Sequence, residues 1–222
     1  TPHAANAADF NTAKNALLEI TGYQLESDFS LLFKKAGKLK NKEVILSLYL
    51  DKDEMVAKDY FRAWYYHMNF NGNTVVDEEG NALGDDPLNL KGDGLQYNEY
   101  RESFVKSYDK ADSRRAATFL EYYSSPNMEE ATFGVSTLKY LGHAEDGTRY
   151  FDSDVIMMRY ADVLLMMAEC ENGLGGSCAP WINQVRQRAY GDNYTAEIAY
   201  TDGDYAANEL AILKERDKEF VA

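Results

Sequence analysis

The clearest hydrophobic pattern lies in the last third of the chain. Apolar side chains recur there every three or four residues, as on one face of an α-helix. They are Ile156, Tyr160, Val163, Leu164, Met167, Cys170 and Leu174. The run Gly173–Gly176 ends this helix, Ser177 can cap the next one, and Pro180 is tolerated in its first turn. The second stripe consists of Ile182, Val185 and Ala189. Together they predict a helical hairpin.

Three further elements follow from the same kind of pattern. Ala4–Ile20 is rich in alanine and predicts a helix that ends at Gly22. Glu43–Leu50 is dense in strand-forming residues that alternate, and it predicts a strand. A third helix of the last part begins at about Tyr205, with one apolar side made of Leu210, Leu213 and Phe220. The pattern as a whole favours a mainly helical protein.

The region 52–132 shows no lasting period and contains many turn residues. Two aromatic clusters lie in it, Tyr60–Phe70 and Leu95–Tyr100. Binding residues often lie in such irregular segments, held by a more regular scaffold. We therefore expect a ligand to bind within this region.

The most apolar stretch, Val155–Gly176, has three possible roles. A membrane span needs about 20 mostly apolar residues, and here Arg159 and Asp162 interrupt the run. The methionines come as neighbours, 157–158 and 166–167, and neighbours on a helix point about 100° apart, which does not suit one copper ion. We therefore predict a helix whose methionines fill the core, with Arg159 and Asp162 meeting on one face.

Composition and charge narrow the ligand classes. The 222 residues are 45% hydrophobic, enough for one good-sized core or two small ones. The net charge of −14 disfavours nucleic acid and anionic membrane surfaces, and it leaves neutral ligands such as sugars or peptides open. A solvated acidic surface explains most of the charge.

No metal or enzyme motif is present. The three histidines have no zinc-ligand spacing, and the acidic loops do not match an EF-hand. We expect no cofactor, although an irregular structural calcium site stays open. Cys170 and Cys178 flank the hairpin turn and suit either a disulfide or buried thiols.

Three blocks of the last third resemble the SusD/RagB family, in matching order and spacing. The matched residues are Arg159, Tyr160, Ala161, Val163, Leu164, Leu165, Met166, Ala168, Glu169, Asn183, Val185, Arg186, Arg188, Ala189, Ile212, Leu213, Glu215, Arg216 and Glu219. Weaker matches lie upstream. Residues 112–114 resemble the family's Asp-Pro-Arg motif, and Lys139-Tyr140 resembles its Lys-Tyr pair. Departures such as Asp162 for Glu are mild.

The resemblance implies a mainly α, SusD-like fold of tetratricopeptide-like helical hairpins, with irregular loops and a short strand or hairpin. It implies a single SusD-like region over 1–222, the middle-to-late part of a longer protein, with a ligand-binding part at 52–132 and a helical scaffold at 155–222. Such proteins are not enzymes. They are lipid-anchored at the Gram-negative cell surface, where they capture oligosaccharides, or peptides in some members, for a SusC-like TonB-dependent barrel.

The family's charged signature residues imply structural ion pairs rather than a ligand site. They are Arg159, Asp162, Glu169, Arg186, Glu215 and Arg216. Sugar binding needs flat rings for the C–H face of a pyranose and polar groups for its hydroxyls. The candidates in the irregular region are Trp64, Tyr65, Tyr66, Asn69, Tyr97, Tyr100 and Arg101. The alternative is that these rings are core.

Two other function classes remain open. A glycoside hydrolase would use paired carboxylates, but 37 acidic residues make a pair easy to find by chance. A helical-repeat scaffold that binds a protein segment would need more than one hairpin.

Overall fold

The computed structural model describes residues 6–35, 41–54, 62–66, 70–92, 94–127 and 129–221. It separates into two compact units. Unit 1 comprises residues 1–32, 40–47 and 156–221, and unit 2 comprises residues 33–39 and 48–155. Among the described residues, no helix is both long and apolar enough to cross a membrane. We describe each unit by itself.

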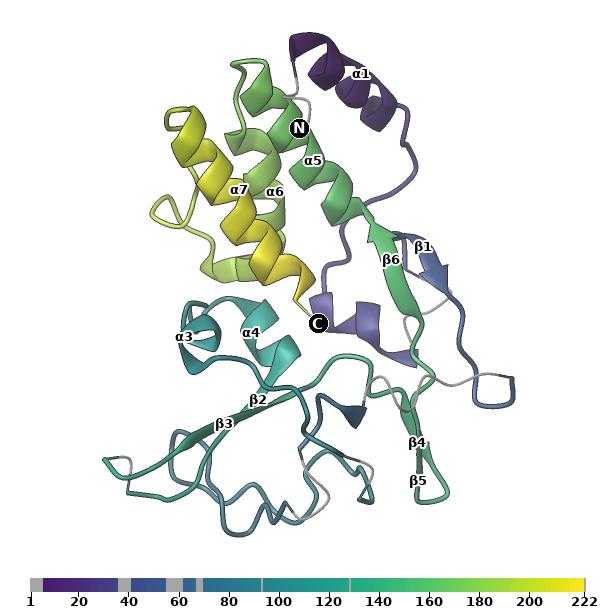
Figure 1. Ribbon diagram of the computed structural model, residues 1–222, viewed down its shortest axis with the longest axis vertical. Helices are drawn as coiled ribbons and strands as arrows, with labels where there is room; N and C mark the ends of the chain where they lie inside the picture. Colours follow the sequence, from purple (N-terminus) through teal and green to yellow (C-terminus); the bar gives the residue numbers. More distant parts are fainter. Residues whose placement is uncertain are drawn as a thin grey trace. The chain divides into compact units, whose positions relative to one another are not determined.

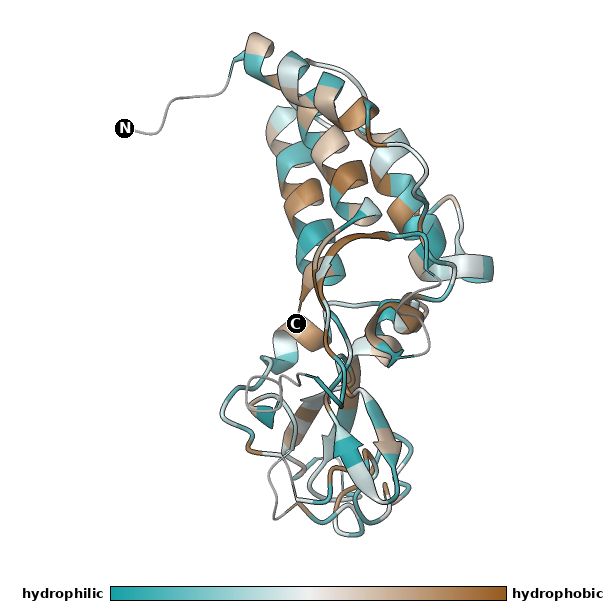
Figure 2. Ribbon diagram, turned by 90° about the vertical axis from the view of Figure 1, so that its right-hand side faces the viewer, coloured by the Kyte–Doolittle hydropathy of each residue, from teal (hydrophilic) through white to brown (hydrophobic). Residues whose placement is uncertain are grey.

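The described part of unit 1 is built from four helices, and the hairpin that the sequence predicts is present. The helices are α1 (Ala7–Leu18), α5 (Tyr160–Gly173), α6 (Ala179–Tyr190) and α7 (Tyr205–Phe220). α5 packs against the other three, and the helices run side by side in both views (Figures 1 and 2). Two 3₁₀ turns, Phe29–Phe33 and Gly191–Asn193, complete the elements near this unit.

The core of unit 1 is made by one face from each of α5, α6 and α7. Its fully buried members are Leu164, Leu165, Ala168, Cys178, Ile182, Val185 and Ile212. Both cysteines are free thiols and both are buried. Burial raises the pKa of the Cys178 thiol to about 11, so it is a poor nucleophile at neutral pH.

The helix predicted from Ile156 begins instead at Tyr160, and residues before it form a strand. β6 (Val155–Arg159) pairs with β1 (Val44–Leu48), which confirms the predicted strand at 43–50. The Asp162 carboxylate accepts the Arg159 backbone N–H at 3.2 Å and so fixes the helix start. Met157 on β6 is 69% exposed, whereas Met167 on α5 is 2% exposed. The prediction that all these methionines fill the core is therefore wrong for 157–158.

The cap of α6 also differs from the prediction. Ser177 does not cap the helix itself. The Asp202 carboxylate, which lies before α7, accepts the backbone N–H groups of Cys178 at 2.8 Å and Ala179 at 3.0 Å. The Ser177 hydroxyl donates to the same carboxylate. A distant acid therefore satisfies the N–H groups that the local serine was expected to cap.

The described residues of unit 2 form two short helices and two antiparallel hairpins. The helices are α3 (Glu102–Val105) and α4 (Ser113–Thr118). The hairpins are β2 (Phe119–Tyr123) with β3 (Phe133–Thr137), and β4 (His143–Glu145) with β5 (Thr148–Tyr150). Asp112 caps α4 and also forms an ion pair of 2.7 Å with Arg114, with both side chains buried. The two charges of the motif at 112–114 therefore satisfy each other inside the unit.

Candidate functional site

The signature charges of unit 1 form a buried cluster of two arginines and two carboxylates. Arg159 Nη1 contacts Glu43 Oε1 at 2.7 Å and Glu219 Oε1 at 2.5 Å. Arg188 pairs with the same two acids. All four side chains are at most 4% exposed. Burial lowers the pKa of Arg159, but the two carboxylates outweigh it, and the net shift is upward. Two arginines and two carboxylates make the cluster neutral. It joins β6, α6 and α7 to Glu43, the residue that precedes β1.

The other predicted ion pairs lie nearer the surface. Arg186 Nε contacts Glu215 Oε2 at 2.8 Å. Arg216 lies 3.7 Å from both Asp162 and Glu169. The predicted meeting of the Arg159 and Asp162 side chains does not occur, because Asp162 accepts the backbone N–H. Burial raises the pKa of Asp162.

Sequence reasoning missed three members of the buried cluster. Arg188 and Glu219 belong to the matched blocks and Glu43 to the predicted strand, but none of the three is among the expected ion pairs. The signal that connects Glu43 to Arg159 is the pairing of β1 with β6. No spacing within the sequence reveals that pairing.

Two of the predicted ligand-contacting rings belong to the core of unit 2. Tyr65 is fully buried, and its hydroxyl donates to the Lys139 carbonyl at 2.8 Å. Tyr66 is 4% exposed, and its hydroxyl donates to the Asp86 carboxylate. Burial and that hydrogen bond raise the pKa of Tyr66 well above its usual range. These positions correct the prediction, since neither ring has surface to offer a ligand.

The two aromatic clusters, which are separate in the sequence, are brought together by backbone pairing. Leu95 donates its N–H to the Arg62 carbonyl, Gln96 to Tyr65 and Asn98 to Ala63, each at 2.9 Å. Gly94 permits this approach: a Cβ there would lie 1.6 Å from the carbonyl oxygen of Tyr66. The segment 94–98 is thereby fixed beside the segment 62–66.

Tyr97 is the most exposed of the predicted rings. It is 77% exposed. The preceding Gln96 has a φ of +47°, which is rare for a residue with a side chain. The Gln96 amide donates to Glu99 Oε1 at 2.6 Å and to the Tyr122 hydroxyl at 3.1 Å. Gln96 is held in this strained conformation by these two hydrogen bonds and by the hydrogen bond from its N–H to the Tyr65 carbonyl. The next residue, Tyr97, presents its ring to solvent.

Polar side chains flank this ring. Asn98, Glu99 and Arg101 are exposed, and Gln96 is partly exposed. We call the group of Gln96, Tyr97, Asn98, Glu99 and Arg101 the Tyr97 surface. It combines a flat ring with hydrogen-bonding groups, as sugar binding requires.

The remaining predicted ligand residues contribute less surface. Trp64 and Tyr100 are partly buried beside each other, with ring centroids 5.0 Å apart. Asn69 lies outside the described residues. The structure therefore exposes both Tyr97 and Arg101 and leaves the Trp64 and Tyr100 rings partly buried beside each other.

A half-buried carboxylate supports the segment that holds the Tyr97 surface. Asp86 accepts the Tyr66 hydroxyl and the backbone N–H groups of Leu90 and Lys91, the last two at 2.8 Å each. Burial opposes ionisation of Asp86, but the Tyr66 hydroxyl and the two N–H groups outweigh it and lower its pKa. The carboxylate therefore links the loop 84–92 to the segment that pairs with residues 94–98.

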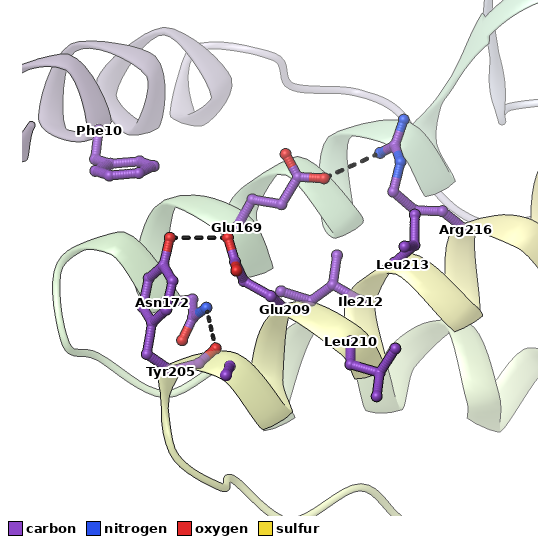
Figure 3. Close-up of a pocket in the computed structure, with 10 residues that line it drawn as sticks. Phe10, Glu169, Asn172, Tyr205, Glu209, Leu210, Ile212, Leu213 and Arg216 are labelled. Carbon is purple, nitrogen blue, oxygen red and sulfur yellow. Dashed lines mark hydrogen bonds and ion pairs between the residues drawn. The ribbon is translucent and has the colours of Figure 1, made fainter. Parts of the chain in front are cut away.

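A groove of about 570 Å³ lies among α1, α5 and α7 of unit 1 (Figure 3). Leu210 and Leu213 line it and are 51% and 56% exposed. The predicted apolar side of α7 is thus partly on the surface, and Ile212 supplies the core contact. The groove's polar groups bond one another, as Tyr205 does with Glu209 at 2.8 Å. We call it the Leu213 groove, and apolar side chains, including the Phe10 ring, make up much of its lining.

The described residues contain no group of three or more His, Cys, Asp or Glu side chains placed to hold a metal ion.

Comparison with known proteins identifies the fold. Residues 120–222 match the model of the SusD family. The SusD-like protein P25 of Formosa agariphila is 32% identical over 116 residues, which are 51% of this chain and 21% of that protein.

Two solved structures show how far the likeness extends. A SusD superfamily protein of Bacteroides fragilis matches 98% of this chain with a TM-score of 0.88 and 31% identity. The chain spans only 46% of that structure. A surface glycan-binding protein A of Bacteroides thetaiotaomicron, solved with laminarihexaose, shares the fold over 97% of this chain and 47% of its own. Its TM-score is 0.57 and its identity 18%.

The family match covers the hairpin and α7, and the structural match covers both units. Together these matches support a fragment of a SusD/RagB family protein.

Proposed function

We propose that the chain binds neutral oligosaccharides at its Tyr97 surface and is not an enzyme. The observation that carries this proposal is the 77% exposed Tyr97 ring on a backbone held in place by hydrogen bonds. A preorganised ring loses little entropy when a sugar stacks on it. Asn98 and Arg101 can bond the hydroxyls at the ring's edge. The family and the distant relative solved with laminarihexaose support the same ligand class.

In the whole protein, this binding would serve nutrient capture at the outer-membrane surface. The family resemblance supports a lipid-anchored protein that passes the oligosaccharide to a SusC-like TonB-dependent barrel. Affinity purification of the whole protein from its native outer membrane tests this step. A barrel transporter should co-purify, and its absence under mild detergent contradicts the delivery role.

Calorimetric titration with neutral glucan, mannan, galactan and xylan hexasaccharides tests the binding role. Tyr97→Ala should weaken the observed affinity by about tenfold, or ~1.4 kcal/mol, while Tyr97→Phe keeps the ring and the affinity. Tyr49→Ala is the matched control, because Tyr49 is also exposed, at 48%, in unit 2. Equal affinity of all three variants contradicts the proposed site. Binding of peptides without binding of any hexasaccharide would assign the Tyr97 surface to peptides instead.

A further inference from the structure

A second groove, in which glutamine and serine side chains share the lining with two tyrosines, lies within unit 1. It has a volume of about 510 Å³, within the range of small-molecule sites. Residues from the turn after α1, the start of α5 and the last turns of α6 line it: Tyr23, Gln24, Leu25, Ser27, Tyr160, Gln184, Gln187, Arg188 and Gly191. We call it the Gln187 groove.

The walls of the Gln187 groove are fixed by backbone contacts. Gln24 donates its N–H to the Lys42 carbonyl at 3.1 Å. Glu26 donates its N–H to Glu43 Oε2 at 2.7 Å. Because Glu43 belongs to the buried ion cluster, the segment carrying Tyr23 and Ser27 is anchored to the core. On the other wall, α6 ends at Tyr190, and its C-cap Gly191 has a φ of +50°.

The lining of this groove is polar but carries no free charge. Arg188 is the charged member, and it pairs with Glu43 and Glu219. Gln184 donates to the Pro180 carbonyl at 3.1 Å. Gln24 and Gln187 are exposed, and no hydrogen bond joins their side-chain amides to another described residue. A neutral ligand loses no ion hydration on entering such a groove, whereas an anion finds no cation to pair with.

We propose that the Gln187 groove is a second binding site for a neutral carbohydrate, separate from the Tyr97 surface. Tyr23 and Tyr160 provide ring faces for the apolar side of a sugar. A glutamine amide both donates and accepts, so Gln24 and Gln187 match the double character of a sugar hydroxyl. Ser27 adds a hydroxyl of the same kind. The inference rests on the proposed function for its ligand class, and it gives this chain two contact points for that class.

NMR of the ¹⁵N-labelled chain tests the second site separately from the first. The neutral hexasaccharides named above are added, and the side-chain amide signals of Gln24, Gln184 and Gln187 are followed. We expect these signals to shift and saturate with at least one hexasaccharide. They should do so equally in the Tyr97→Ala variant. The double variant Tyr23→Ala/Gln187→Ala should lose the response, while Tyr205→Ala, an exposed tyrosine of the same unit, keeps it.

The outcomes separate the two proposals. Signals that stay fixed while Tyr97-dependent binding occurs overturn the second site and leave the proposed function intact. Glutamine signals that shift without any Tyr97-dependent binding support the second site and contradict the Tyr97 surface as a sugar site. A neutral peptide mixture that shifts the same signals at lower concentration than every hexasaccharide overturns the carbohydrate assignment.

Discussion

The clustered signature charges of unit 1 are buried in its interior, whereas unit 2 holds an aromatic side chain, Tyr97, at its surface. In unit 1, Arg159 and Arg188 are buried and paired with two buried carboxylates. In unit 2, the backbone of a segment with buried tyrosines holds the segment that presents Tyr97 to solvent. The residues that identify the family therefore stabilise the fold. The residues of the Tyr97 surface lie where the sequence is least regular, because a surface ring needs support but no periodic pattern.

Arg159→Ala should produce the largest loss of stability. Removal of the guanidinium leaves Glu43 and Glu219 buried with only Arg188 between them, which costs about 3–5 kcal/mol. Urea unfolding followed by circular dichroism measures it. Arg216→Ala is the matched control, since its side chain is 31% exposed and 3.7 Å from its acids; we expect about 1 kcal/mol or less. Equal costs at the two positions would contradict the division between buried and surface pairs.

Gly94→Ala should affect unit 2 rather than unit 1. The new Cβ would lie 1.6 Å from a backbone oxygen, so the pairing of residues 94–98 with 62–66 must open. We expect a cost of about 3 kcal/mol or more and loss of hexasaccharide binding. Gly80→Ala is the control, because nothing lies within 4 Å and only its left-handed φ of +86° resists the change. Retained binding by Gly94→Ala would show that the pairing is dispensable.

Asp86 gives unit 2 a dependence on pH. Its pKa is lowered in the folded chain, so its contribution is present above the unfolded value of about 3.9 and is lost as the pH falls through the folded value. Asp86→Asn should cost about 1–3 kcal/mol at neutral pH, because the N–H groups of Leu90 and Lys91 lose a charged acceptor. The loss should shrink as the pH approaches 3. Thermal unfolding from pH 3 to 7 measures both, and a constant difference contradicts the assignment.

The sequence predicted regular elements better than it predicted what they face. The spacing of Leu164, Ala168, Ile182 and Val185 suffices for the hairpin, because apolar period and core contact coincide there. The same period includes Ile156 by coincidence, since that residue lies on a strand. The strand exists because β1 lies beside it, and such pairing is a tertiary effect.

The candidate site was predictable as a region but not as a surface. Aromatic clusters with asparagine and glutamine nearby pointed to residues 60–70 and 95–100. Composition alone did not divide core rings from exposed ones, so Tyr65 and Tyr97 looked alike. Their difference arises from the hydrogen bonds between the two segments and from Gly94.

Met157→Ala should have the smallest effect on stability. It is compared with Met167→Ala, since both methionines lie in the apolar stretch Val155–Gly176. Met157 is 69% exposed on β6, so its truncation should change the free energy of unfolding by less than about 0.5 kcal/mol. Met167→Ala removes a side chain that is 2% exposed on the following helix, and it should cost about 2–5 kcal/mol. Urea unfolding of both variants measures the difference. A large loss at Met157 would mean that β6 is covered by further chain, because an exposed thioether has no packing to lose.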